Sequence, residues 1–254
     1  MVLVLILDPR PSGYRKSLIY KCHAFVDFRP SGIAIIALQM AVHRHPPAVV
    51  ARTATAADLG RLTDILSTSF FGDPTWGPLL GERDRRRRAM GSLLGFFANS
   101  ALRFPWVLLS EAGESAAVWI PPGEDELAPE DNEPFERLIH EQCGDGAADL
   151  LEALERFEQA RPQRLHFYLS LLGTHDDSRG HGIGMGLLAE SLRRIDALGM
   201  PCYLESTNPV NDARYGRQGF EPVGSFTVPT GAVVTTMWRE PRGEAAAPAA
   251  ASPP

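Results

Sequence analysis

The chain has 254 residues, of which 44% are hydrophobic and 22% are charged. This composition is typical of a globular protein with a sizeable core, and it excludes wholesale disorder and a disulfide-stabilised miniprotein. Acidic residues outnumber basic ones, 31 to 25, which gives a net charge of −6, so no nucleic-acid-binding surface is predicted. The three cysteines, Cys22, Cys143 and Cys202, fit neither a disulfide framework nor a paired-cysteine zinc site. They indicate a reducing, cytoplasmic setting, and no set of side chains has metal-ligand spacing.

The start and the end of the chain differ in composition from the rest. Residues 1–45 contain six basic and two acidic side chains. The apolar opening precedes the first positive charge, unlike a signal peptide, and the apolar run 33–42 is shorter than the roughly 20 residues of a membrane helix. We therefore expect 1–45 to be a disordered or loosely attached extension, with Met40 as an alternative start. Residues 241–254 are expected to be a low-complexity tail, and 46–240 a single domain.

The region between these ends alternates strand-like and helix-like segments. A β-branched run at 48–53 precedes apolar residues at helical spacing up to Phe70, and a second helix is expected at about 82–102. The remaining expected elements are strands at 106–109 and 116–120, helices at about 134–143 and 147–160, a strand at 164–173, a helix at 182–198, a strand at 202–204, a helical turn at 211–217 and a hairpin at 228–238. The arginine run 85–88 is interpreted as a solvated helix face, with an anion-binding patch as the alternative.

The most informative segment is a glycine-rich loop between an apolar strand and an amphipathic helix. It reads Arg179-Gly-His-Gly-Ile-Gly184. Glycines let the backbone bend tightly and approach a ligand, and the free amides at the start of the helix favour an anion such as a pyrophosphate. No lysine is present for a Walker loop. The Rossmann spacing occurs only in a frame that starts at Gly184, well past the strand and inside the expected helix.

A second pattern follows about thirty residues later. Asn211, Tyr215 and Gly219-Phe220 have the offsets of an N-x-x-x-Y-x-x-x-G-F signature, and a short strand ending in Glu205-Ser206 precedes it. Together with the R-x-x-G-x-G loop at 179–184, this order resembles the GNAT superfamily of N-acetyltransferases over about residues 48–240. Ala117-Val118-Trp119, together with the Leu-Glu-Ser after the helix, resembles in particular the puromycin N-acetyltransferase-like branch of that superfamily.

The resemblance implies an α/β GNAT fold with a mixed, twisted sheet of six or seven strands flanked by helices. The sheet is expected to be splayed between the fourth and fifth strands. It also implies that acetyl-CoA is the cosubstrate. The residues expected to bind it are Leu172, Gly173, Thr174, Arg179, Gly180, His181, Gly182, Ile183, Gly184 and Asn211. His181 departs from the family, which often has Lys or Arg at this position, and this departure is expected to weaken the affinity for acetyl-CoA.

Two residues are expected to carry the chemistry. Tyr215 matches the family's general acid, which protonates the leaving thiolate, with a packing role beside Phe220 as the alternative. Glu205 is a carboxylate on an otherwise apolar strand, where a raised pKa would suit a general base. It could equally orient the substrate ammonium or cap the next turn. His175 and a water molecule are the other candidates for the base.

The implied function is acetyl-CoA-dependent transfer of an acetyl group directly to a primary amine of a small molecule. Two alternatives stay open: a non-catalytic module that binds acyl-CoA, and an enzyme that acetylates proteins or peptides. Nucleic-acid and membrane partners are not expected, and a homodimer is left open. No motif names the acceptor amine, whose pocket is expected to be built by the first two helices and by loops at about 70–82 and 121–135.

Overall fold

The computed structural model describes residues 26–27, 35–36 and 46–243. Contacts divide the chain into two units, residues 1–45 and 46–254. In the first unit, β1 (Val26–Asp27) pairs antiparallel with β2 (Ile35–Ile36). Most of the expected extension and of the expected C-terminal tail lies outside the described residues. The division of the chain into an extension, a domain and a tail therefore stays a prediction.

A seven-stranded mixed sheet forms the centre of the second unit. Its strand order is β3-β4-β5-β6-β7-β9-β8, and every neighbouring pair is antiparallel except β6 and β7. The strands are β3 (Ala51–Thr53), β4 (Val107–Ser110), β5 (Ser115–Ile120), β6 (Phe167–Thr174), β7 (Cys202–Ser206), β8 (Glu221–Thr227) and β9 (Val233–Arg239). The prediction of a mixed sheet with six or seven strands is therefore confirmed.

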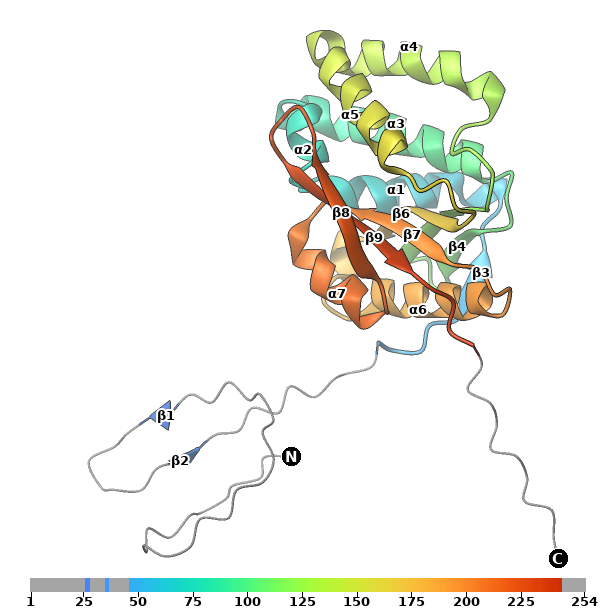
Figure 1. Cartoon of the computed structure of the whole chain (residues 1–254). Coiled ribbons are helices and arrows are strands. Elements are labelled where there is room, and N and C mark those ends of the chain that lie inside the picture. The colour runs from blue at the N-terminus through green and yellow to red at the C-terminus, as the bar shows by residue number, and fades with distance from the viewer. Residues whose placement is uncertain (1–25, 28–34, 37–45, 244–254) are drawn as a thin grey trace, which may run out of the picture. The chain divides into compact units, whose positions relative to one another are not determined.

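Helices cover both faces of this sheet (Figure 1). They are α1 (Leu59–Phe70), α2 (Trp76–Leu79), α3 (Arg83–Ala101), α4 (Asn132–Cys143), α5 (Ala147–Ala160), α6 (Ile183–Asp196) and α7 (Asp212–Arg217). Helices α1, α3, α4 and α5 pack on one face and α6 on the other, and each face has its own apolar core. Side chains of a strand alternate between the two faces. In β5, accordingly, Val118 joins the first core and Trp119 the second.

The sheet opens between β6 and β7. These strands pair only at Phe167 with Cys202 and at Tyr168 with Tyr203. Beyond this point β6 continues to Thr174 and β7 to Ser206 without pairing to each other. The edge of β6 that faces the gap keeps backbone groups that an extended ligand could pair with. The predicted splay between the fourth and fifth strands of the domain is confirmed.

Two expectations from the sequence need correction. The closing hairpin is longer than 228–238, because its first arm is β8, whose residues are almost all exposed and so lack the alternation that marks a strand. The arginine run is not a wholly solvated face, because Arg85 donates a hydrogen bond of 2.9 Å to the carbonyl of Gln142 and Arg86 one of 2.9 Å to that of Gly81. Cys202 is buried in the core.

Candidate active site

A cavity of about 1060 Å³ lies where β6 and β7 diverge. Its wall includes the unpaired end of β6, the glycine loop, β7, α7 and parts of α3, α4 and α5. The site residues expected from the sequence contribute to this wall, except for His181 and the alternative base His175. The residues brought together are Leu172, Gly173, Thr174, Arg179, Gly180, Gly182, Ile183, Gly184, Glu205, Asn211 and Tyr215. Segments far apart in the sequence therefore line the same cavity.

The glycine loop has the geometry of an anion site. Gly180 and Gly182 have φ values of 84° and 78°, a left-handed conformation that glycine adopts without strain. Gly182 caps α6, and the first backbone bond of the helix runs from the amide of Gly186 to the carbonyl of Gly182, at 2.9 Å. The amides before Gly186 therefore have no partner within the helix. With the positive end of the helix dipole, they can hold a phosphate group.

Two further glycines serve close packing. A Cβ atom on Gly184 would lie 2.5 Å from Oγ1 of Thr174, so only glycine lets the start of α6 approach the end of β6 this closely. A Cβ atom on Gly173 would lie 2.6 Å from Oγ of Ser69 in the same way. Gly184 thus lets the glycine loop, and Gly173 lets α1, lie close against the open end of β6.

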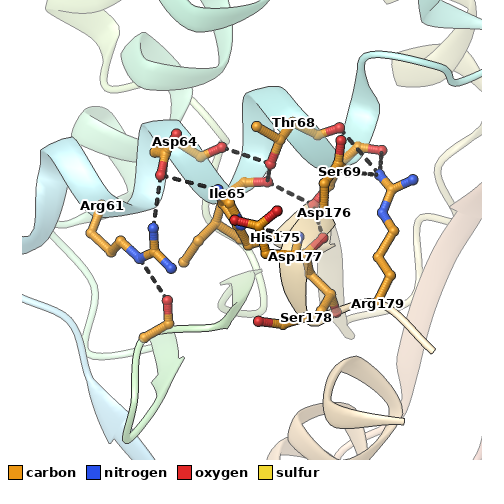
Figure 2. Close-up of polar contacts among 12 residues, drawn as sticks. Arg61, Asp64, Ile65, Thr68, Ser69, His175, Asp176, Asp177, Ser178 and Arg179 are labelled. Carbon is orange, nitrogen blue, oxygen red and sulfur yellow. Dashed lines mark hydrogen bonds and ion pairs between the residues drawn. The ribbon is translucent and has the colours of Figure 1, made fainter. Parts of the chain in front are cut away.

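Arg179 anchors the loop to α1 (Figure 2). Its guanidinium donates hydrogen bonds to the carbonyls of Thr68 and Ser69, at 3.1 and 2.8 Å, and pairs with Asp176 at 2.9 Å. The carbonyls at the C-terminal end of a helix attract a cation. This side chain therefore contributes to the shape of the loop.

Neither loop histidine lies in the cavity wall. Nδ1 of His175 accepts a hydrogen bond from the amide of Asp177, at 3.3 Å, and its Nε2 lies 3.4 Å from Asp64, as Figure 2 shows. His181 is exposed, and its Nδ1 lies 3.3 Å from the carbonyl of Ser178. His175 thus lies beside α1 and outside the cavity wall that Glu205 and Tyr215 share.

The open end of β6 is held by hydroxyl groups. Oγ of Ser115 donates a hydrogen bond of 2.6 Å to the carbonyl of Gly173, and Oγ of Ser69 donates one of 2.8 Å to that of Thr174. The strand end is therefore fixed on the sides that face β5 and α1. No sequence pattern pointed to Ser69, because its partner lies 105 residues away.

Tyr215 lies in α7 with its ring 6.2 Å from that of Phe220, and it faces the cavity. Burial raises the pKa of its phenol to about 12, and the nearby Asp73 adds to this shift. The phenol therefore keeps its proton at neutral pH. Asn211 precedes the helix, and its Oδ1 accepts a hydrogen bond of 2.9 Å from Arg214.

Glu205 lies on β7, on the opposite side of the splay from the end of β6. Burial raises the pKa of its carboxyl to about 7, an effect that Arg161 and the phenol of Tyr168 partly offset. Its Oε1 is shielded from solvent and has no hydrogen-bond partner among the described residues. A carboxyl group with this pKa can accept a proton near neutral pH.

A buried ion pair next to Glu205 was not apparent from the sequence. Arg161, which follows α5, forms an ion pair with Glu126 of the β5–α4 loop, and its guanidinium lies 4.2 Å above the ring of Tyr168. Ser170 donates a hydrogen bond of 2.5 Å to the same glutamate. Glu126 belongs to an acidic segment that resembles any solvated loop, so only the folded chain shows its role.

No known protein-family model matches this chain. Solved structures do match it. The fold is that of the GNAT acetyltransferases. The structure of the histone acetyltransferase HPA2 and related acetyltransferase from Corynebacterium glutamicum has a TM-score of 0.55 and 24% identity, and the match covers 77% of this chain and 98% of that one.

Two insect enzymes share the GNAT fold at lower identity. Arylalkylamine N-acetyltransferase 2 from Aedes aegypti has a TM-score of 0.53 and 15% identity, over 77% of this chain and 100% of that one. The polyamine N-acetyltransferase of Drosophila melanogaster, which catalyses the formation of N-acetylagmatine, has a TM-score of 0.51 and 18% identity, over 76% of this chain and 99% of that one. The expected GNAT fold is thus confirmed, whereas the closer resemblance to the puromycin branch stays a prediction.

Two features are absent from the described residues. No helix in them is both long and apolar enough to cross a membrane. Likewise, no group of three or more His, Cys, Asp and Glu side chains within the described ranges is arranged to hold a metal ion.

Proposed function

We propose that the protein is an acetyl-CoA-dependent N-acetyltransferase that transfers the acetyl group directly to a primary amine of a small molecule. One observation carries this proposal: the same cavity joins an anion-binding loop, an open strand edge, and two titratable groups with separated pKa values, about 7 for Glu205 and about 12 for Tyr215. Such a separation assigns the base and the acid of a proton-transfer reaction.

The residues present fit acetyl-CoA. The amides at Gly180–Gly184 would hold its pyrophosphate, and the open edge of β6 at Leu172–Thr174 would pair with its amide-rich arm. Bound there, acetyl-CoA supplies the acetyl group as an activated thioester. A backbone N–H at the end of β6 would polarise the thioester carbonyl, a contribution of about 3 kcal/mol in comparable oxyanion sites.

Glu205 and Tyr215 would move the protons of the reaction. The carboxylate of Glu205 accepts a proton from the acceptor ammonium, and the neutral nitrogen then forms the new bond to the acetyl carbon. The carbon–sulfur bond breaks, and the phenol of Tyr215 gives its proton to the departing thiolate. The nitrogen loses its second proton to the resulting phenolate, directly or through water, which leaves a neutral amide and restores the phenol. Desolvation lowers the pKa of an ammonium group, so the apolar wall of the cavity favours the first of these transfers.

The raised pKa of Glu205 also separates this proposal from a module that only binds acyl-CoA. Burying a carboxyl group with one oxygen unpartnered costs free energy, and a protein that only binds acyl-CoA gains nothing from that cost. The position of Glu205 across the splay from the end of β6 suits a group that orients or deprotonates an amine. The thiol-release assay described next also tests the alternative of a protein or peptide acceptor.

The proposal is tested by thiol release from acetyl-CoA in the presence of a panel of amines. The panel should include arylalkylamines, aminonucleosides, polyamines and peptides with free amino groups. We expect amine-dependent release with at least one small amine and little release without amine. Tight binding of acetyl-CoA with no amine-dependent release from any member would show a binding module instead. Release only with peptides would assign the function to protein acetylation.

A further inference from the structure

The part of the cavity away from the glycine loop has an apolar wall. Six side chains from the helices on one face of the sheet form this wall, and we call them the apolar chamber: Met90, Leu93 and Phe97 of α3, Phe135 of α4, and Leu151 and Leu154 of α5. The rings of Phe97 and Phe135 meet edge to face, with centroids 4.5 Å apart. Such a surface binds hydrocarbon and aromatic groups and offers no partner to a charge.

Inside the cavity, one carboxylate has an oxygen without a hydrogen-bond partner in the described part of the chain. Arg161 and Glu126 pair with each other and are only 22% and 19% exposed, so their charges largely cancel. The oxygens of Asp73 are occupied by hydrogen bonds from Thr207 and from two backbone amides, which are all neutral donors. Oε1 of Glu205 is shielded and has no hydrogen-bond partner among the described residues. Glu205 is therefore the carboxylate of the inner wall that has an oxygen available to an ammonium group.

Other carboxylates reach the cavity only at its rim. They belong to Asp125, Glu155 and Glu158, whose side chains are exposed. Exposed charges interact weakly because water and salt screen them. They attract amines in general toward the entrance, but they do not provide a desolvated site for a second cation.

We infer that the acceptor is an amine with a single ammonium group on an extended apolar or aromatic body, the ammonium at Glu205 and the body in the apolar chamber. This inference rests on the proposed function and narrows its substrate class. It excludes polyamines, whose second charge would lie against the chamber without a partner. The GNAT fold alone does not decide this, since structures with that fold include both an arylalkylamine and a polyamine enzyme.

A matched pair of amines tests the inference. Heptylamine and hexane-1,6-diamine have the same number of heavy atoms and differ only in a terminal methyl or ammonium group. Because an unpaired charge in an apolar wall is strongly disfavoured, kcat/KM for heptylamine should exceed that for the diamine by about 100-fold or more. Equal values, or a preference for the diamine, would overturn the inference and leave the proposed function intact.

Binding is measured separately from turnover, so that the substrate class and the proposed function can each be contradicted without the other. Calorimetric titration of the protein saturated with coenzyme A should show heptylamine binding and much weaker binding of the diamine. Heptylamine that binds but is not acetylated would support the chamber and contradict the proposed function. Binding of neither amine would overturn the assignment of the chamber as the acceptor site.

A pair of variants tests the chamber itself. Leu151→Asp places a carboxylate in the chamber and should shift the ratio of kcat/KM toward the diamine by about tenfold or more. Leu138→Asp is the control, because Leu138 on α4 is also half-buried against the same core but does not line the cavity. It should keep the wild-type ratio. An equal shift in both variants would mean that a loosened core causes the change, and the inference would fall.

Discussion

The hydroxyl group of Thr207 donates a hydrogen bond of 2.7 Å to Oδ2 of Asp73, across 134 residues of sequence. A second hydrogen bond joins the same two segments, because the hydroxyl group of Thr75 donates a bond of 2.9 Å to the carbonyl of Thr207. The loop between α1 and α2 is thus bound twice to the end of β7, two residues after Glu205. These two bonds tie one segment of the cavity wall to the strand that carries Glu205.

Thr207→Val should therefore destabilise the protein by about 1–3 kcal/mol, because the buried carboxylate of Asp73 loses a donor. Burial already raises the pKa of Asp73, and Thr207 opposes that shift. The variant should raise this pKa further, so its loss of stability should grow as the pH rises above the usual range of an aspartate. Urea denaturation at pH 4 and pH 8 measures this, with Thr207→Ser as the control that keeps the donor. Equal stability of the Val and Ser variants at pH 8 would contradict the prediction.

The anion site can be tested at Gly180, where a Cβ atom would meet no other atom within 4 Å. Gly180→Asp and Gly180→Asn impose the same backbone strain at positive φ, which Asp and Asn tolerate better than most residues. Only Asp adds a negative charge, so it should weaken acetyl-CoA binding about 10- to 100-fold relative to Asn. Calorimetry at low and high salt should show this difference shrinking as salt increases. Equal affinities of the Asp and Asn variants for acetyl-CoA would show that its phosphates do not bind at this loop.

Glu205→Gln should abolish most activity and yet stabilise the protein at pH 8. The carboxyl group of the wild type has a pKa of about 7 in the folded protein, against 4.5 ordinarily. It therefore stays protonated to a higher pH in the folded state than in the unfolded state. Folding stability should thus fall as the pH rises from about 4.5 to 7, by on the order of 3 kcal/mol. Gln does not titrate, so the stability of the variant should equal or exceed that of the wild type at pH 8 and lack this fall. Parallel stability profiles for the two proteins would show that Glu205 is not buried as described.

The sequence predicted the parts of the site that local patterns encode. Glycine spacing locates the loop at 179–184, and fixed offsets locate Tyr215, because backbone conformation and helix position depend on nearby residues. The Glu126–Arg161 pair depends instead on how α4 and α5 fold over α3, and nothing near either residue encodes that packing. Packing against distant residues was also not predictable at the loop glycines. Gly182 suggested only access for a ligand, yet a Cβ atom there would also lie 2.9 Å from Pro47, so Gly182→Val would disturb packing as well as binding.

Tyr215→Phe is the test of the acid. The change removes the hydroxyl group and keeps the ring beside Phe220, so folding and acetyl-CoA affinity should change little. General acid catalysis contributes about 10²–10⁴-fold, so kcat should fall by a factor in that range. Because the pKa of the phenol is about 12, the fall should be the same at every pH from 6 to 10. Deprotonation of Glu205, with its pKa of about 7, is expected to make the rate rise near pH 7, and this rise should persist in the variant. A variant within about twofold of wild type would leave Tyr215 a packing residue, and a loss that varied across this pH range would show that another group supplies the proton.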